Sequence, residues 1–111
     1  MRMRKKKHRD ERIARCADIM IQNPKDFTGR WGEPFGRCAP LFLEIGCGKG
    51  RFICETAMQN PENNYLAVEK CPDVVLLAME KALEANVPNL RFFYGDAREL
   101  YESFEPSEVD G

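Results

Sequence analysis

The sequence predicts an α/β fold with a parallel, doubly wound sheet. Three short, mostly apolar runs alternate with helical patterns, and only a few residues connect one segment to the next. A glycine-rich loop, at 46–50, follows the first run directly. Strands that alternate with helices over short connections form parallel sheets through right-handed crossovers, and both faces of such a sheet are covered. A glycine loop between the first strand and the next helix is typical of a cofactor site in this fold class.

The three predicted strands are 41–45, 65–68 and 90–94. Each has the length and apolar character of a buried strand, and each is followed by glycine or by an acidic residue. A fourth strand would begin near 109–111, where the sequence stops. We therefore expect a sheet that is truncated after about three strands.

Helices are expected over 49–60 and 72–86, with a short helix over 97–104. Pro61 ends the first of them. Pro72 suits the first turn of the second, because the N–H that proline lacks is not needed there. The second helix also carries a broad apolar stripe, since its apolar residues recur every three to four positions.

The domain organisation is predicted to comprise an N-terminal region, 1–39, and a cofactor-binding half, 40–111. Apolar residues recur at helical spacing over 10–22, and Asn23-Pro24 interrupts the pattern, so a helix is expected there. Proline and glycine are frequent from residue 24 onwards, which predicts an irregular linker up to the first strand.

Two aromatic residues, Trp31 and Phe35, lie in this linker. We expect them to anchor it onto the domain rather than to stack on nucleic-acid bases.

Length and composition favour one domain of a soluble, cytoplasmic protein. The chain has 111 residues and no apolar run long enough to span a membrane or to serve as a secretory signal. Its 5 cysteines lack the spacing of a zinc site or a redox pair, so reduced thiols and no bound metal are expected.

Positive charge is concentrated at the N-terminus, although the net charge is −1. Eight of the 17 basic residues fall within the first fifteen positions. Such an arm is typical of a segment that meets nucleic-acid phosphates, and the alternative is a solvated tail. The candidate nucleic-acid-binding residues are Arg2, Arg4, Lys5, Lys6, Lys7 and Arg9.

The glycine loop has the pattern Gly46-x-Gly48-x-Gly50, which lets a backbone turn tightly beside a ligand. Two acidic residues, Glu69 and Asp96, follow the second and third predicted strands. Parallel strands end at one edge of their sheet, so these carboxylates are expected to meet the loop there. A carboxylate at the position of Glu69 can accept hydrogen bonds from both hydroxyls of a ribose.

The charge beside the loop indicates which cofactor binds. Glu44, two residues before the first glycine, would repel a pyrophosphate and attract the cationic methionine end of S-adenosylmethionine. The loop also departs from the dinucleotide pattern G-x-G-x-x-G. Both features favour S-adenosylmethionine, while Glu44 could alternatively be a capping or supporting carboxylate.

The chain resembles the bacterial tRNA (guanine-N7-)-methyltransferases over nearly its whole length. The residues that carry the resemblance are Met1-Arg2-Met3-Arg4, Gly29-Arg30-Trp31, the glycine loop with its flanks, Asn64-Tyr65-Leu66-Ala67-Val68-Glu69 and Gly95-Asp96-Ala97. The resemblance implies a Rossmann-like methyltransferase fold and methyl transfer from S-adenosylmethionine to N7 of guanine in tRNA.

Carried over by position, the resemblance implies a role for each residue of the site. Glu44 would lie by the methionine end of the cofactor, Glu69 would hold the ribose, and Asp96 with the backbone of Ala97 would meet the adenine. The three glycines would let the backbone pass close. No catalytic acid, base or nucleophile is implied, so neither His8 nor Cys47 is assigned one of these roles.

Part of the family pattern is absent from this sequence. The Asp-Pro-Trp segment that follows the fourth strand in the family, and the C-terminal residues that contact the guanine, are missing. The chain would then form one wall of the pocket, be inactive alone, and leave its first strand as an exposed edge. The intact protein is expected to be a monomer or a homodimer.

Two other functions remain open on sequence alone. One is a non-catalytic, truncated module that binds tRNA or a partner through its basic arm. The other is a nicotinamide or flavin enzyme of the same fold, which the carboxylate of Glu44 disfavours.

Overall fold

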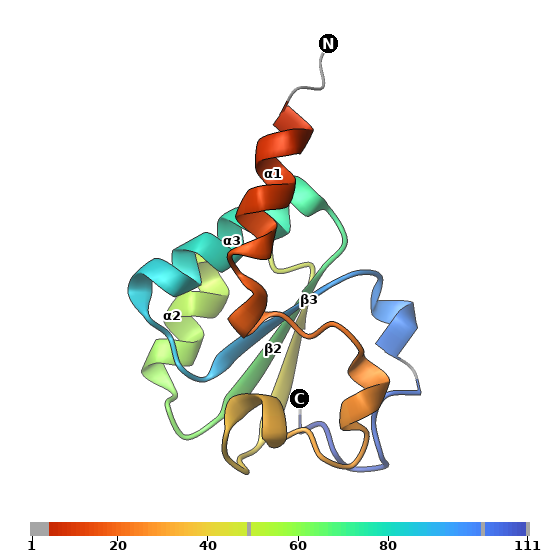
Figure 1. The fold of residues 1–111 in the computed structure, drawn as a ribbon. Helices are drawn as coiled ribbons and strands as arrows, with labels where there is room; N and C mark the ends of the chain where they lie inside the picture. Colours follow the sequence, from red (N-terminus) through yellow and green to blue (C-terminus); the bar gives the residue numbers. More distant parts are fainter. Residues whose placement is uncertain (1–4, 49, 101, 111) are drawn as a thin grey trace.

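The computed structural model describes residues 5–48, 50–100 and 102–110 of the chain. Its centre is a three-stranded parallel sheet of order β1-β2-β3, made of β1 (Leu41–Ile45), β2 (Asn64–Glu69) and β3 (Leu90–Tyr94) (Figure 1). The predicted α/β fold with a parallel sheet is therefore confirmed. The outer strands have their predicted bounds, and β2 is longer than predicted by one residue at each end.

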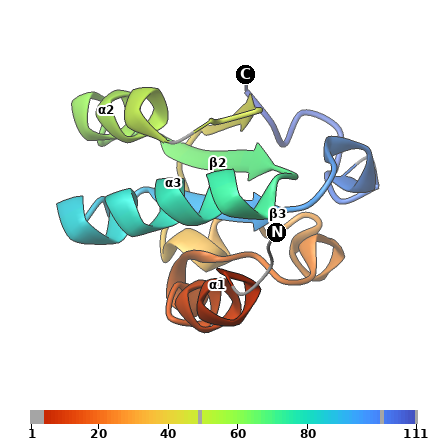
Figure 2. The ribbon, with the colours of Figure 1, turned by 90° about the horizontal axis from the view of Figure 1, so that it is seen from above.

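Two helices cover one face of this sheet, as Figure 2 shows: α2 (Arg51–Gln59) and α3 (Pro72–Ala85). Pro72 occupies the first turn of α3, and Asn86 ends the helix in the left-handed conformation, with a φ of 57°. The buried face of α3 packs with Tyr65 and Phe92 in one core cluster. The buried apolar stripe of α3 is narrower than the sequence predicts, because Leu83 is 41% exposed.

The opposite face of the sheet is covered by irregular segments rather than by helices. Leu66, Val68 and Phe93 point into a second core cluster, alternating along the strands with residues of the first. The predicted anchors Trp31 and Phe35 are buried in this cluster, which confirms their role in fixing the linker. The indole N–H of Trp31 donates a hydrogen bond to the carbonyl of Ser103 at 2.7 Å.

The N-terminal helix differs from the prediction of 10–22. The structure has α1 over Lys5–Ala14, a short 3₁₀ turn over Ala17–Ile19, and then an extended segment. Met20 pairs in parallel with Phe92, and the Ile21 N–H donates to the Phe92 carbonyl at 2.8 Å. The helix prediction was wrong beyond Ala14 because these residues instead cover the free edge of β3.

The predicted helix over 97–104 is also shorter. A 3₁₀ turn covers Ala97–Leu100, and the described residues from 102 onwards form turns and irregular chain. In this conformation the carbonyl of Ser103 reaches the indole of Trp31, and the Trp31 ring stacks on Phe104 with 4.9 Å between centroids.

The outer edge of β1 is only partly covered. Asp110 donates its N–H to the Leu41 carbonyl at 2.7 Å and accepts the Leu41 N–H on its carboxylate at 2.9 Å. At the other end of β1, Ile45 is 62% exposed. Asp110 thus lies beside β1, where the sequence predicts a fourth strand. Among the described residues, no helix has the length and apolar character needed to cross a membrane.

Candidate functional site

The ends of all three strands form a crevice at the carboxyl edge of the sheet. A cavity of about 160 Å³ lies there, lined by Ile45, Gly46, Val68, Glu69, Lys70, Gly95, Asp96 and Ala97. Four of the sequence-predicted residues thus meet as expected, namely Gly46, Glu69, Asp96 and Ala97. Small-molecule pockets are typically about 300–1,000 Å³, so the described residues accommodate only part of a nucleotide-sized ligand.

The glycine loop presents an open backbone at two of its three glycines. Gly46 and Gly48 have φ angles of 73° and 59°, which favour glycine, and a Cβ atom at either would meet nothing within 4 Å. Their backbones are thus accessible to a ligand, as the sequence predicts.

Gly50 has a different role from the other two glycines. Its φ is 87°, and a Cβ atom there would lie 2.7 Å from both Cα and Cβ of Ala78. Glycine at this position lets α2 begin directly against α3. The third glycine of the motif therefore serves helix packing in this structure.

Glu69 is held between the glycine loop and the start of α3. One carboxylate oxygen accepts the Gly48 N–H at 3.3 Å, and the other accepts the Cys71 N–H at 3.2 Å. Each oxygen keeps acceptor capacity, because a carboxylate oxygen has two lone pairs. The carboxylate is thus oriented and can still accept hydroxyl groups of a ligand.

Asp96 is fixed by Arg98. The Arg98 guanidinium donates to both carboxylate oxygens, with Nη2 2.9 Å from Oδ2, and the Arg98 backbone N–H donates to Oδ1 at 2.9 Å. These bonds, chiefly those from the side chain, lower the pKa of Asp96 to about 2. Asp96 is therefore ionised at neutral pH and is a hydrogen-bond acceptor only.

Glu44 lies near the glycine loop but outside the lining of the crevice. Its half-buried side chain makes no hydrogen bond to any residue that the structure describes. Its negative charge contributes to the raised pKa of Cys47. Glu44 is thus close to the loop and has acceptor capacity available.

Cys47 lacks the properties of a nucleophile. Burial, followed by the negative charge of Glu69, raises the pKa of the Cys47 thiol to about 12. The thiol is protonated at neutral pH, whereas nucleophilic attack requires the thiolate. Across the described part of the chain, no three His, Cys, Asp or Glu side chains cluster in a way that could hold a metal ion.

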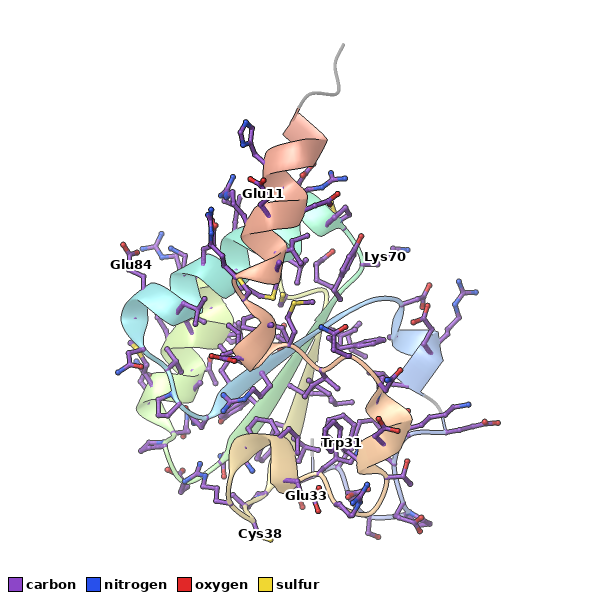
Figure 3. The ribbon with its side chains drawn as sticks, viewed as in Figure 1. Glu11, Trp31, Glu33, Cys38, Lys70 and Glu84 are labelled. Carbon is purple, nitrogen blue, oxygen red and sulfur yellow. The ribbon has the colours of Figure 1, made fainter. Side chains whose placement is uncertain are left out.

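The crevice contains residues that the sequence motifs did not single out. Lys70 follows β2 directly and is labelled in Figure 3, where it lies near the upper end of the sheet. Ile45, Val68 and Gly95 also line the cavity. All four adjoin a predicted strand end, so that position alone could have identified them.

The predicted nucleic-acid-binding residues lie on or before α1. Arg2 and Arg4 fall outside the described residues, and Lys5, Lys6 and Lys7 form the first turn of α1. Arg9 is engaged by the protein itself, since its Nη1 donates to Asp73 Oδ1 at 3.0 Å. Sequence reasoning missed this partner, because 64 residues separate the two and no local pattern links them.

The family of the chain follows from comparison with known proteins. Residues 38–111 match a family model described as a putative methyltransferase. The chain belongs to this methyltransferase family. The resemblance drawn from its motifs is therefore confirmed.

Individual relatives give a more specific similarity for this methyltransferase chain. It is 47% identical over 109 residues to the tRNA (guanine-N(7)-)-methyltransferase of Listeria innocua, covering 98% of the chain and 51% of the relative. It is 43% identical over 110 residues to the protein of the same name from Lactococcus lactis subsp. cremoris, covering 99% of the chain and 51% of the relative. The chain thus spans about half the length of the curated relatives that it matches.

Proposed function

We propose that the chain is the S-adenosylmethionine-binding half of an enzyme that methylates N7 of guanine in tRNA. The observation that carries the choice of cofactor is the contact between Glu69 and the glycine loop. The Gly48 N–H, one of the groups that a pyrophosphate would need, already donates to the carboxylate of Glu69. Such a loop disfavours an anionic cofactor and suits a cofactor with an uncharged ribose and a cationic end.

The described residues fit the parts of this cofactor. Glu69 would accept the ribose hydroxyls, and the ionised Asp96 would accept the adenine amino group next to the backbone of Ala97. Glu44 would attract the cationic methionine end. Gly46 and Gly48 would allow the ligand to approach the backbone, because open space faces both.

The reaction needs positioning more than acid–base chemistry. When bound, S-adenosylmethionine supplies a sulfonium methyl group. Guanine N7 carries an unprotonated lone pair, so the N–CH₃ bond can form while the S–CH₃ bond breaks and its electron pair returns to sulfur. No proton is removed first, and the chain's contribution is to bind, orient and stabilise charge.

We propose a cytoplasmic location, which fits a tRNA substrate, and an intact form that is a monomer or a homodimer. The described crevice offers one wall of a pocket, so the chain by itself is expected not to transfer methyl groups. A non-catalytic module that binds tRNA is the second candidate, favoured by the small volume of the crevice. Methyl transfer to unmodified tRNA by the chain alone would contradict the hypothesis of a non-catalytic module. It would also contradict the expectation that the chain is inactive by itself.

Isothermal titration calorimetry tests the cofactor assignment. S-adenosylhomocysteine is expected to bind the chain and NAD is not. Glu69→Gln should weaken S-adenosylhomocysteine binding about tenfold, the cost of one charged hydrogen bond. Glu62→Gln, at an exposed carboxylate in the turn before β2, is the matched control. Binding of NAD alone, or equal affinity in the Glu69 variant, would contradict the proposal.

A further inference from the structure

Two ion pairs hold α1 against α3. Arg9 Nη1 lies 3.0 Å from Asp73 Oδ1. Arg12 binds Glu80 through two nitrogens, with Nε 2.8 Å from Oε2 and Nη2 bonded to Oε1. The bond from Arg12 lowers the pKa of Glu80, so this carboxylate is charged at neutral pH. A bidentate pair of this kind fixes direction as well as distance.

Among the side chains of α1 that the structure describes, apolar contacts fix only those in its C-terminal part. Ile13 packs against the first core cluster, and Cys16, just beyond the helix, is 1% exposed. The N-terminal turns of α1 reach α3 through the arginine side chains. The two ion pairs are therefore what sets the direction of those turns.

The order of the partners shows which way α1 points. From Arg12 to Arg9 the chain runs toward the start of α1, and from Glu80 to Asp73 it runs toward the start of α3. Both helices therefore begin on the same side of the molecule. Since α3 starts three residues after Glu69, that side is the carboxyl edge of the sheet, and Figure 1 shows α1 extending past the start of α3.

The first turn of α1 holds three consecutive lysines. Lys5 precedes Arg9 by four residues, which is about 6 Å along a helix axis. The helix backbone of Lys5, Lys6 and Lys7 therefore continues from the anchored Arg9 on the side of the molecule where the cofactor crevice opens.

We propose that Asp73 and Glu80 are positioning residues for RNA binding: they aim the basic first turn of α1 at an RNA phosphate backbone that passes along the carboxyl edge of the sheet. This inference rests on the proposed function. Considered by charge alone, two carboxylates beside a basic arm disfavour the binding of a polyanion. Their favourable contribution is instead that they order the arm before RNA binds. An unanchored arm carries the same charge but loses more conformational entropy on binding.

The double variant Asp73→Asn with Glu80→Gln tests this inference by the sign of its effect. It removes two negative charges, so simple electrostatics predicts tighter binding of tRNA. The positioning role predicts weaker binding instead, by about fivefold, because two ion pairs that order the arm are lost. Binding of labelled tRNA to the chain is measured by fluorescence anisotropy at constant salt.

The control variant Glu62→Gln with Glu84→Gln removes the same charge from exposed carboxylates that make no ion pair with described residues of α1. It should bind tRNA as tightly as the unaltered chain or more tightly. Thermal unfolding of both double variants verifies that they are folded.

A charge-swapped pair, Arg12→Glu with Glu80→Arg, keeps the net charge and restores the contact with reversed polarity. It should recover most of the affinity that Glu80→Gln alone loses. If the charge-swapped variant does not recover this affinity, the inference is overturned, because the result would mean that Arg12 itself contacts the RNA. Unchanged or tighter binding by the Asp73/Glu80 double variant would also overturn it, while leaving the proposed function in place. No binding of tRNA by the unaltered chain would contradict both together.

Discussion

Asp96 shows how a single contact prepares a residue for its proposed role. Its pKa falls from 3.8 to about 2, first because the Arg98 side chain donates to it and then because the Arg98 backbone does. Since the pKa in the folded chain lies below the unfolded value, the stabilisation is fully present above pH 3.8 and is lost as pH falls toward 2. The site should therefore keep its acceptor at any physiological pH.

Replacing Arg98 tests this coupling. Arg98→Gln is expected to raise the pKa of Asp96 toward 3.8, because the charged hydrogen bonds are lost. Titration of the Asp96 carboxyl carbon by nuclear magnetic resonance measures the shift. Arg30→Gln removes an exposed arginine elsewhere and should leave the Asp96 midpoint unchanged. An Asp96 midpoint that also stays near 2 in the Arg98 variant would disprove the assigned cause.

At the scale of single residues, the sequence predicted where the acidic residues of the site meet. It did not predict the hydrogen bonds that orient them. Glu69 and Asp96 each follow a predicted strand, and parallel strands end at one edge, so their proximity could be foreseen. The bonds from Gly48 to Glu69 and from Arg98 to Asp96 depend on side-chain and loop conformations. No periodicity or spacing encodes those conformations.

The packing of α2 against α3 depends on one glycine. Gly50→Ala is expected to lower the free energy of unfolding by about 3 kcal/mol or more, because the new methyl group would overlap Ala78 and the φ of 87° disfavours alanine. Gly48 also has a positive φ, 59°, but a new methyl group there would face open space, so Gly48→Ala should cost only about 1 kcal/mol.

Urea denaturation of the two alanine variants separates these effects. A larger loss for Gly50→Ala supports helix packing as the role of this glycine. Equal losses would mean that backbone conformation alone explains its presence.

The elements that the sequence predicted least well are those that tertiary contacts determine. The strands and α3 have strong local patterns, and their observed bounds lie within one residue of the predicted ones. The spacing of Met20 and Ile21 also fits a helix, yet both extend along β3 because its edge offers hydrogen-bond partners. Pairing across a sheet edge outweighs helix periodicity here, and one sequence cannot reveal that outcome.

For the molecule as a whole, the basic arm makes a prediction about salt. Replacing Lys5, Lys6 and Lys7 with alanine should weaken tRNA binding about equally across tRNA sequences. It should also reduce the slope of log affinity against log salt by up to about 3, because up to three fewer counterions are released. The measurement is a salt series of tRNA binding with the unaltered and altered chains.

A matched control replaces Lys25, Arg30 and Lys81, which are exposed cations away from the first turn of α1. This control should change the salt slope less than the arm variant does. Equal slopes in the two variants would favour the alternative interpretation, in which the arm is a solvated tail.

The whole fold was more predictable than the way its two faces are covered. The alternation of strands and helices predicts the sheet, its parallel direction and the covering of both faces. It does not predict that the second face is covered by Trp31, Phe35 and their neighbours in irregular segments. Some of those contacts join residues far apart in the sequence, such as Trp31 and Ser103, which are 72 positions apart.

The buried indole of Trp31 also provides an intrinsic optical probe. The sequence contains 1 tryptophan, so the tryptophan emission comes from one known environment. Trp31 lies in the second core cluster and does not line the crevice. A change in its emission would therefore report loosening of the linker and of residues 103–104. Ligand binding at the crevice, followed by another method, should leave this emission unchanged.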